Sequence, residues 1–293
     1  MRRFESCRGY QTPATYEPET VADHCPAWTS GWRTAIIQDT QELGREQGTV
    51  DGSARIEQQA SAAPVRPTRV IHSSDLHLGI DEAKHSVHLL EAVLGAARAT
   101  AADVILLVGD VFDHNRVRPE LLDATTKLLA AAGRPTVILP GNHDSLADGS
   151  VYRRGDFASV EGVHVIGLTS DETVHFPELD LEVWGRAHFD LFDMVPLRDP
   201  PKRRTRWHIA AAHGHWVTGP HDARRAYLIH DHEIRSIDAD YLALGHWDKW
   251  APAGDGTVPA YYSGSPAFAK SVNLIELDPA SGVRVDRVPV IEG

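Results

Sequence analysis

The chain has 293 residues, 42% of them hydrophobic and 24% charged, which is ordinary globular composition and enough for one large domain or two small ones. Its longest apolar runs fall short of the roughly 18 residues that a membrane span needs, and no apolar segment follows the basic N-terminus, so we expect no membrane anchor or secretory signal. The formal net charge of −12 argues against a protein that wraps nucleic acid through a broad basic surface. The only cysteines, Cys7 and Cys25, exclude a disulfide framework and fit a cytoplasmic protein.

The first 66 residues differ from the rest of the chain. They show no sustained hydrophobic periodicity, and their last part is rich in glycine, serine, glutamine and proline. We expect an N-terminal extension over residues 1–66 that is mostly disordered or loosely packed, followed by a domain over residues 67–293. A wrongly assigned start codon is the alternative explanation for this segment.

From residue 69 on, strand and helix patterns alternate. Residues 69–73, 104–108 and 135–139 are short apolar runs with β-branched side chains, which predict buried strands. Between them, residues 86–99 carry apolar side chains on one helical face, and a second helix is predicted over residues 119–133, with proline at its start and glycine at its end. This β-α-β-α-β order predicts a layered α/β fold.

After residue 163 the predicted strands become shorter. The candidates are residues 163–166, 181–184, 208–212, 241–244, 260–263, 273–277 and 283–288. The last two flank the turn sequence Asp-Pro-Ala-Ser-Gly and predict a hairpin.

Side chains of the types that can bind metals cluster where predicted strands end. They are Asp75 and His77 after the first strand, Asp110 and Asp113 after the second, Asn142, His143 and Asp144 after the third, and His213, His215, His246 and Asp248 after two later strands. In open α/β sheets, sites form beyond the carboxyl ends of the strands, so these five loops are expected to meet at one pocket.

The donor types indicate which ions the pocket would hold. Asp, Asn and His together suit first-row divalent ions such as Mn²⁺, Fe²⁺ or Zn²⁺, and the lack of cysteine among them excludes a thiolate zinc site. About six or seven donors are too many for one ion but fit two ions roughly 3.5–4 Å apart that share a carboxylate. Such a pair activates water and holds the oxygens of a phosphoryl group. The sequence therefore predicts a dimetal site that hydrolyses phosphoesters.

The set of motifs resembles the signature of the calcineurin-like metallophosphoesterases. It consists of Asp-x-His at 75–77, Gly-Asp-x-x-Asp at 109–113, Gly-Asn-His-Asp at 141–144, His213, and Gly-His at 245–246. The match runs from residue 69 to about residue 290. The resemblance implies a four-layer α/β/β/α sandwich with mixed β-sheets, a dimetal site at the sheet edge, and an enzyme that hydrolyses phosphoric esters.

The resemblance also assigns roles to individual residues. The first metal is expected on Asp75, His77 and Asp110, and the second on Asp110, Asn142, His213 and His246, so that Asp110 bridges. His143 is expected to protonate or stabilise the leaving oxygen, and Asp144 to orient His143. Mn²⁺ is the expected ion, with Fe²⁺, Zn²⁺ and Mg²⁺ as alternatives.

One position departs from the family pattern. The family motif usually ends as Gly-His-x-His, and here Asp248 stands in place of the last histidine. A carboxylate binds Mn²⁺ or Mg²⁺ well, so we predict that Asp248 is a ligand of the first metal. The alternative is that Asp248 points away and fewer protein ligands hold that ion.

Longer stretches narrow the resemblance to the DNA repair exonuclease branch, which includes SbcD-type nuclease subunits. Residues 70–79, 241–246 and 262–266 carry it, and it implies manganese-dependent cleavage of DNA and an SMC-like ATPase partner. Against this, the chain ends soon after the last hairpin, so we expect no DNA-capping domain, and no segment for docking the ATPase is evident. A phosphatase or phosphodiesterase for a small phosphoester or nucleotide is the alternative, and a metal-binding module with little catalysis is the third hypothesis.

Basic and aromatic side chains near the motifs have two interpretations each. Residues 202–206, and likewise Arg116 and Arg118, either contact phosphates or belong to a solvated surface. Trp247 and Trp250 either stack on a base or complete the edge of the core.

Three further histidines lie close to the motifs in sequence. We expect His114 and His215 to support the ligands without binding metal themselves, and His188 to lie near the pocket.

Overall fold

The computed structural model describes residues 66–80, 87–189 and 194–290. All of them belong to a unit that spans residues 60–293. The extension predicted over residues 1–66, with both cysteines, lies outside the described residues except for Arg66. Within the described part of the chain, no helix has the length and apolar character needed to cross a membrane.

The first sheet is mixed and has six strands in the order β14-β13-β1-β2-β3-β4. They are β1 (Thr68–Ser73), β2 (Val104–Val108), β3 (Thr136–Leu139), β4 (Val163–Val165), β13 (Ser271–Asp278) and β14 (Gly282–Pro289). Strands β1 to β4 run parallel, whereas β13 is antiparallel to both β1 and β14. Every residue of β2 is buried, as expected of a strand covered on both faces.

The second sheet also has six strands, in the order β11-β12-β10-β7-β6-β5. They are β5 (Thr173–Phe176), β6 (Leu181–Gly185), β7 (Trp207–His213), β10 (Tyr241–Gly245), β11 (Ala251–Ala253) and β12 (Ala260–Tyr262). Strands β6, β7, β10 and β12 are parallel, and the two edge strands are antiparallel to their neighbours.

Helices connect the strands and cover the sheets. They are α1 (His88–Ala99), α2 (Pro119–Ala131), α3 (Val151–Arg154), α4 (Asp231–Ser236) and α5 (Pro266–Ala269). A short parallel pair, β8 (His215–Trp216) and β9 (Leu228–Ile229), follows β7. Pro119 occupies the first turn of α2, where its missing N–H costs no helical hydrogen bond.

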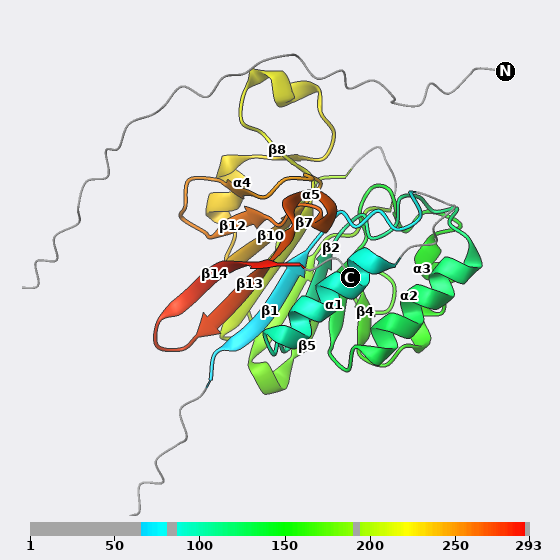
Figure 1. Cartoon of the computed structure of the whole chain (residues 1–293). Helices are drawn as coiled ribbons and strands as arrows, with labels where there is room; N and C mark the ends of the chain where they lie inside the picture. Colours follow the sequence, from blue (N-terminus) through cyan, green and yellow to red (C-terminus); the bar gives the residue numbers. More distant parts are fainter. Residues whose placement is uncertain (1–65, 81–86, 190–193, 291–293) are drawn as a thin grey trace, which may run out of the picture. The chain divides into compact units, whose positions relative to one another are not determined.

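Two hydrophobic cores give the molecule its layers. Ile209 and its β7 neighbour Ala210 point to opposite faces of the second sheet, as the period of a strand requires. Ile209 joins the core that includes first-sheet strands and helices α1 and α2, whereas Ala210 joins a core that includes Ile234 of α4. The two sheets therefore lie face to face with helices outside each of them, and the four-layer α/β/β/α sandwich with mixed sheets is confirmed (Figure 1).

The predicted strands and helices are present with small shifts of their ends. The predicted hairpin is confirmed, because β13 and β14 pair antiparallel and Asp278 accepts hydrogen bonds from the backbone of Ala280 and Ser281 in the turn. Strands β5, β8, β9 and β11 were not predicted. Each has only two to four residues, too few to show a hydrophobic period.

Candidate metal centre

The predicted ligands meet at the carboxyl ends of five strands. Asp75 follows β1, Asp110 follows β2 and Asn142 follows β3 in the first sheet, while His213 ends β7 and His246 follows β10 in the second. These strands are parallel within each sheet, so their carboxyl ends share an edge. The two sheets contribute ligands to the same cluster because they lie face to face.

Four of these loop residues have left-handed backbone conformation. The φ angles are 54° for Asp75, 48° for His77, 51° for Asp110 and 103° for His246. Non-glycine residues rarely adopt positive φ, and surrounding contacts must hold them there. Backbone hydrogen bonds do so at two of them, since Asp75 N donates to the Gly109 carbonyl (3.1 Å) and His77 N to the Asp110 carbonyl (3.0 Å).

Glycines let the two sheets approach each other at the cluster. A Cβ atom on Gly141 would collide with the backbone and carboxylate of Asp110, and one on Gly245 would collide with the Val108 carbonyl oxygen and the His213 ring. Gly141 and Gly245 are therefore required by close contact, whereas Gly109, beside Asp110, has both a close contact with the His213 ring and a positive φ of 78°.

Asp110, Asn142, His213 and His246 form the tightest part of the cluster. His213 Nε2 lies 3.2 Å from Asp110 Oδ2 and 3.1 Å from Asn142 Oδ1, and His246 Nδ1 lies 3.1 Å from the same amide oxygen. His213 Nδ1 is 3.0 Å from the Val108 carbonyl and donates its proton there, so in the neutral ring Nε2 carries a lone pair. A lone pair facing two oxygen acceptors requires a proton or a metal cation between them.

The pKa values of the clustered side chains also show that positive charge is favourable at this site. Burial alone would lower the pKa of His213, but the charge and hydrogen bond of Asp110, the charge of Asp75 and the hydrogen bond to the Val108 carbonyl together raise this pKa to about 9. Burial would raise the pKa of Asp110, yet His213, His143 and His77 hold it well below its usual range. Burial lowers the pKa of His246 to about 3, and the nearby His213 acts in the same direction, so His246 is neutral near pH 7.

Asp75 lies beside this group and is almost completely buried. Its carboxylate accepts a hydrogen bond from His246 N, with distances of 3.2 Å to Oδ1 and 3.0 Å to Oδ2. Burial raises the pKa of Asp75 to about 6; attraction to His213 opposes this shift and repulsion from Asp110 adds to it. Two carboxylates in one buried site, without another cation, repel each other.

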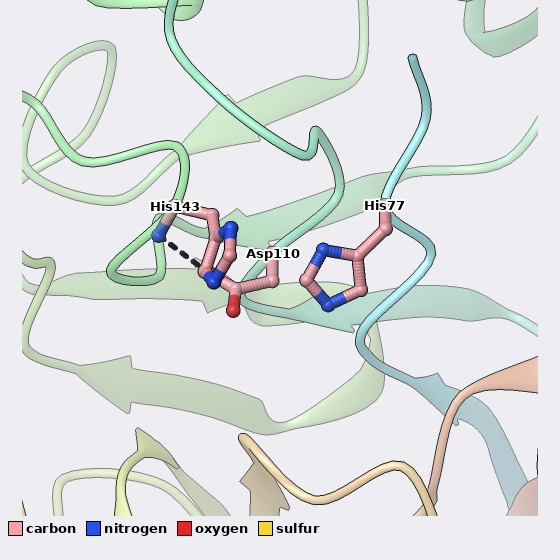
Figure 2. A group of neighbouring side chains, drawn as sticks. All are labelled: His77, Asp110 and His143. Carbon is pink, nitrogen blue, oxygen red and sulfur yellow. Dashed lines mark hydrogen bonds between the residues drawn. The ribbon is translucent and has the colours of Figure 1, made fainter. Parts of the chain in front are cut away.

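Figure 2 shows Asp110 between His77 and His143. Their rings meet edge to face with centroids 4.8 Å apart, and His143 N donates to Asp110 Oδ1 (2.9 Å). His77 Nδ1 lies 3.2 Å from Asp113 Oδ1. Burial would lower the pKa of His77, but the hydrogen bond and charge of Asp113 together with the charges of Asp110 and Asp75 raise this pKa to about 9.

Two groups in the described residues have the spacing of metal ligands. One is His77, Asp110 and His143, the other is Asp110, His213 and His246, and within each group the ligand atoms all lie within 4.8 Å of one another. Asp110 belongs to both, as expected of a carboxylate that bridges two ions. The donor types and the acceptor contacts of His213 fit divalent metals.

Asp144 contacts the backbone of the ligand loops. Its buried carboxylate accepts from the backbone N–H groups of Gly141 (2.7 Å), Phe112 (3.1 Å) and Asp110 (3.3 Å), and from the Tyr152 hydroxyl (2.6 Å). The His143 ring instead has Nδ1 2.7 Å from the Asp113 carbonyl oxygen. Among the described residues, Asp144 therefore holds the ligand loops through their backbone and makes no hydrogen bond to that ring.

The structure does not bring Asp248 into the cluster. Its side chain is exposed, and neither ligand group of the described chain includes it. Its carbonyl accepts from Ser265 N (3.0 Å), which directs the chain toward α5. Metal ligation by Asp248 stays a prediction.

The tryptophans near the motif pack within the protein. Trp247 stacks on Tyr262 with centroids 4.3 Å apart and planes at 6°, and Trp250 stacks on Tyr261 at 5.7 Å. Arg287 lies over the Trp250 ring at 5.1 Å. These contacts favour core packing over base stacking for both residues.

The basic residues 202–206 lie at the opposite end of β7 from the cluster. They precede Trp207, the first residue of β7, whereas His213 ends that strand, so the basic segment is at the opposite edge of the sheet. Arg203 there pairs with Asp240 (3.0 Å) and Asp238 (3.3 Å). Arg116 and Arg118 are exposed on the connection from β2 to α2, at the same edge as the cluster.

Two supporting residues lie next to the ligand loops. His188 is buried, and its Nε2 donates to the His213 carbonyl (2.9 Å), as its sequence position suggested. Tyr152, which donates to Asp144, was not predicted. No sequence signal separates it from an ordinary core tyrosine, because its role depends on a contact with a loop from another part of the chain.

Comparison with known proteins identifies the family. The model of the calcineurin-like phosphoesterases matches residues 68–250, more than half of the chain. The chain belongs to this family. It is accordingly a metal-dependent phosphoester hydrolase by class, and the family resemblance of its motifs is confirmed.

Relatives of the phosphoesterase include components of a nuclease. It is 26% identical over 266 residues to the SbcD subunit of the SbcCD nuclease from Bacillus subtilis (strain 168), covering 72% of this chain and 66% of that protein. It is 35% identical over 88 residues to the SbcD subunit of the SbcCD nuclease from Escherichia coli (strain K12), covering 27% of this chain and 22% of that protein. The chain thus spans just under two thirds of the length of the B. subtilis relative.

Solved structures share the fold. TT1561 of Thermus thermophilus superposes with a TM-score of 0.51 at 15% identity, covering 75% of this chain and 99% of that one. This likeness concerns the fold alone.

Proposed function

We propose that this phosphoesterase is a dimetal phosphodiesterase that cleaves DNA. The observation that carries the hydrolytic part is the cluster around Asp110, where acceptor atoms of Asp, Asn and His face one another at 3.1–3.2 Å and need a proton or a metal cation between them. The similarity to the SbcD subunit of the SbcCD nuclease over 72% of the chain supports DNA as the substrate.

We propose six metal ligands, with Asp110 shared. Asp75, His77 and Asp110 would hold one divalent ion, and Asp110, Asn142, His213 and His246 the other; Asp248 is the additional ligand to be tested. When bound, the ions supply a water acidic enough to act as nucleophile near neutral pH and neutralise charge on the phosphoryl group. The mixture of oxygen and imidazole donors supports Mn²⁺.

His143 is proposed as the catalytic acid. Its ring is 44% exposed, and the Asp113 carbonyl 2.7 Å from Nδ1 keeps a proton on that nitrogen. Nε2 is then the atom that exchanges a proton with the leaving oxygen. Asp144 is proposed to position His143 through the backbone of residues 141–144.

The assembly and location are proposed from the same relatives. The B. subtilis relative is named as one component of the SbcCD nuclease, so we propose an ATPase partner of the SbcC type, a cytoplasmic location and a role in DNA repair. We propose that residues 67–293 form the metallophosphoesterase domain and that residues 1–66 are an extension outside it.

Hydrolysis of a small phosphoester or nucleotide is the second candidate. The net charge of −12 favours it, because a strongly acidic protein attracts polyanions weakly. The basic residues 202–206 do not offset this at the cluster, since they lie at the opposite sheet edge.

A hydrolysis assay with Mn²⁺ tests both candidates. It compares a small phosphodiester, a phosphomonoester and linear DNA, each with the wild type and with His143→Ala. DNA cleavage that is lost in His143→Ala supports the nuclease. Turnover of the small esters alone supports the second candidate, and two bound ions without turnover contradict both.

A further inference from the structure

A loop at the edge of the metal centre has exposed arginines. We call residues 217–227, between β8 and β9, the β8–β9 loop; it contains the 3-10 helix Pro220–Arg224. The loop begins four residues after His213, and in Figure 1 it extends beyond the ends of β7 and β10. Its other end returns to the cluster, because the Tyr227 ring lies 6.1 Å from the His246 ring.

Asp222 fixes the turn of this loop. Its Oδ2 accepts from Thr218 N (2.8 Å), Thr218 Oγ1 (3.0 Å) and Gly219 N (3.1 Å), and its Oδ1 accepts from His215 Nε2 (3.1 Å). Hydrogen bonds from Thr218 and His215 hold the pKa of Asp222 well below its usual range. The one carboxylate of the loop is therefore occupied by the loop itself.

The same turn is linked to the metal centre through His215. Trp247 Nε1 donates to His215 Nδ1 (3.1 Å), and the His215 ring lies 6.2 Å from that of His246. The turn is thus two side-chain contacts away from His246. Because Trp247 is itself stacked on Tyr262, the chain of contacts is anchored in the core.

The outer face of the loop is basic in a strongly acidic protein. Arg224 is exposed two residues beyond Asp222, and Arg225 beside it is exposed as well. A guanidinium binds phosphate through paired N–H groups and stays charged at all physiological pH values. An arginine at this edge is suited to a second phosphate that lies beside the one at the metals.

We propose that Arg224 on the β8–β9 loop binds a phosphate flanking the scissile one, so that the site favours a polynucleotide over an isolated phosphoester. This rests on the proposed nuclease function and deepens it. Asp222 and His215 are positioning residues that hold the loop at the metal centre, and Arg224 lies outside the candidate metal ligands.

The test compares Arg224→Ala with Arg204→Ala in the Mn²⁺-loaded full chain. Arg204 is an exposed arginine at the opposite sheet edge, so its removal changes the net charge equally. Cleavage and fluorescence-anisotropy binding of a labelled single-stranded oligonucleotide are measured across salt concentrations, beside hydrolysis of a small phosphodiester. We expect Arg224→Ala to raise KM for the oligonucleotide about fivefold and to reduce the salt slope of binding by about one, with the small diester hydrolysed as in wild type.

The outcomes separate the two proposals. An unchanged oligonucleotide KM in Arg224→Ala, or the same rise in Arg204→Ala, overturns the role of Arg224 and leaves the nuclease standing. If the wild type hydrolyses the small diester but neither binds nor cleaves the oligonucleotide, the nuclease and the Arg224 inference both fall.

Discussion

The amino edge of the second sheet and the carboxyl edge where both sheets contribute residues each place acidic side chains beside histidines, but among the described residues only the amino edge also pairs such a carboxylate with arginine. At the amino edge, buried Glu182 lies between His208 (3.6 Å) and His175 (3.5 Å), and Asp240 pairs with Arg203 (3.0 Å). At the carboxyl edge, Asp110 and Asn142 face imidazoles, and no ion pair within the described ranges joins Asp75 or Asp110 to lysine or arginine.

The difference separates a structural cluster from a cation site. Buried charges are stable when partners of opposite charge accompany them, as Arg203 accompanies Asp240 at the amino edge. The carboxyl edge instead concentrates acceptors around Asp110 and holds their loops in left-handed backbone conformations. A cluster of Asp and His in this fold is therefore interpreted as a metal site when its carboxylates have no lysine or arginine partner within the protein.

Removal of the shared carboxylate is expected to have the largest effect. Asp110→Asn should lower kcat on the order of 10³-fold, because it removes the one group proposed to hold both ions. Asp240→Asn makes the same chemical change at the amino edge and should leave kcat unchanged. Equal losses in the two variants, measured with a small phosphodiester, would contradict the distinction between the edges.

Loss of the proposed acid should come next. His143→Ala is expected to lower kcat for DNA by about 10²–10⁴-fold with metal content unchanged. The loss should be smaller for an aryl phosphodiester, whose leaving group needs no proton. His175→Ala is the matched histidine at the amino edge and should keep wild-type activity; a uniform loss over both substrates would argue against an acid role for His143.

Glu182→Gln should affect stability and not activity. Glu182 is buried, accepts from Arg204 N (2.9 Å) and faces Nδ1 of both His208 and His175, so replacing one of its two acceptor oxygens by an amide NH₂ group should lower the free energy of unfolding by about 1–3 kcal/mol. Urea denaturation measures this. A Glu182→Gln variant that is as stable as wild type but inactive would contradict the structural role of Glu182 and indicate a catalytic one.

The smallest expected effect is on the pH dependence of stability and comes from His72, which is buried on β1 between the two edges. His72 Nδ1 is 3.0 Å from the Tyr241 hydroxyl, and burial lowers the pKa of this histidine to about 3 from 6.5. Between these pH values His72 is protonated in the unfolded chain but neutral in the native protein. Its titration therefore leaves the free energy of unfolding unchanged above pH 6.5 and lowers it as the pH falls below 6.5.

The expected slope for this group is about 1.4 kcal/mol per pH unit. His72→Gln keeps a polar side chain without titrating, and its stability should decrease less between pH 6.5 and about 5 in urea denaturation. Parallel curves for wild type and variant would show that His72 is not held neutral in the native state.

The sequence predicted the fold and the meeting of the ligands for identifiable reasons. Apolar runs such as residues 104–108 mark buried strands, and the rule that parallel strands present their carboxyl ends at one edge brings Asp110 and Asn142 together in the first sheet and His213 and His246 in the second. The four-layer arrangement came from the family resemblance of the motifs, not from periodicity.

What the sequence did not reveal depends on contacts between distant residues. The Tyr152 hydroxyl on Asp144 and the Asp113 carbonyl on His143 are set by how separate loops meet. Asp248 is exposed, and its carbonyl accepts a hydrogen bond from the distant Ser265 N, a contact that no local sequence pattern predicts. The left-handed conformation of Asp110 has no signal in its residue type alone.

The most direct test of the account is the metal content of the protein. Elemental analysis after dialysis against Mn²⁺ should find two ions per chain in the wild type and in Asp240→Asn, and fewer in Asp110→Asn. Full occupancy in Asp110→Asn, or a wild-type chain that binds no divalent ion, would contradict the claim that the carboxyl edge is completed by cations.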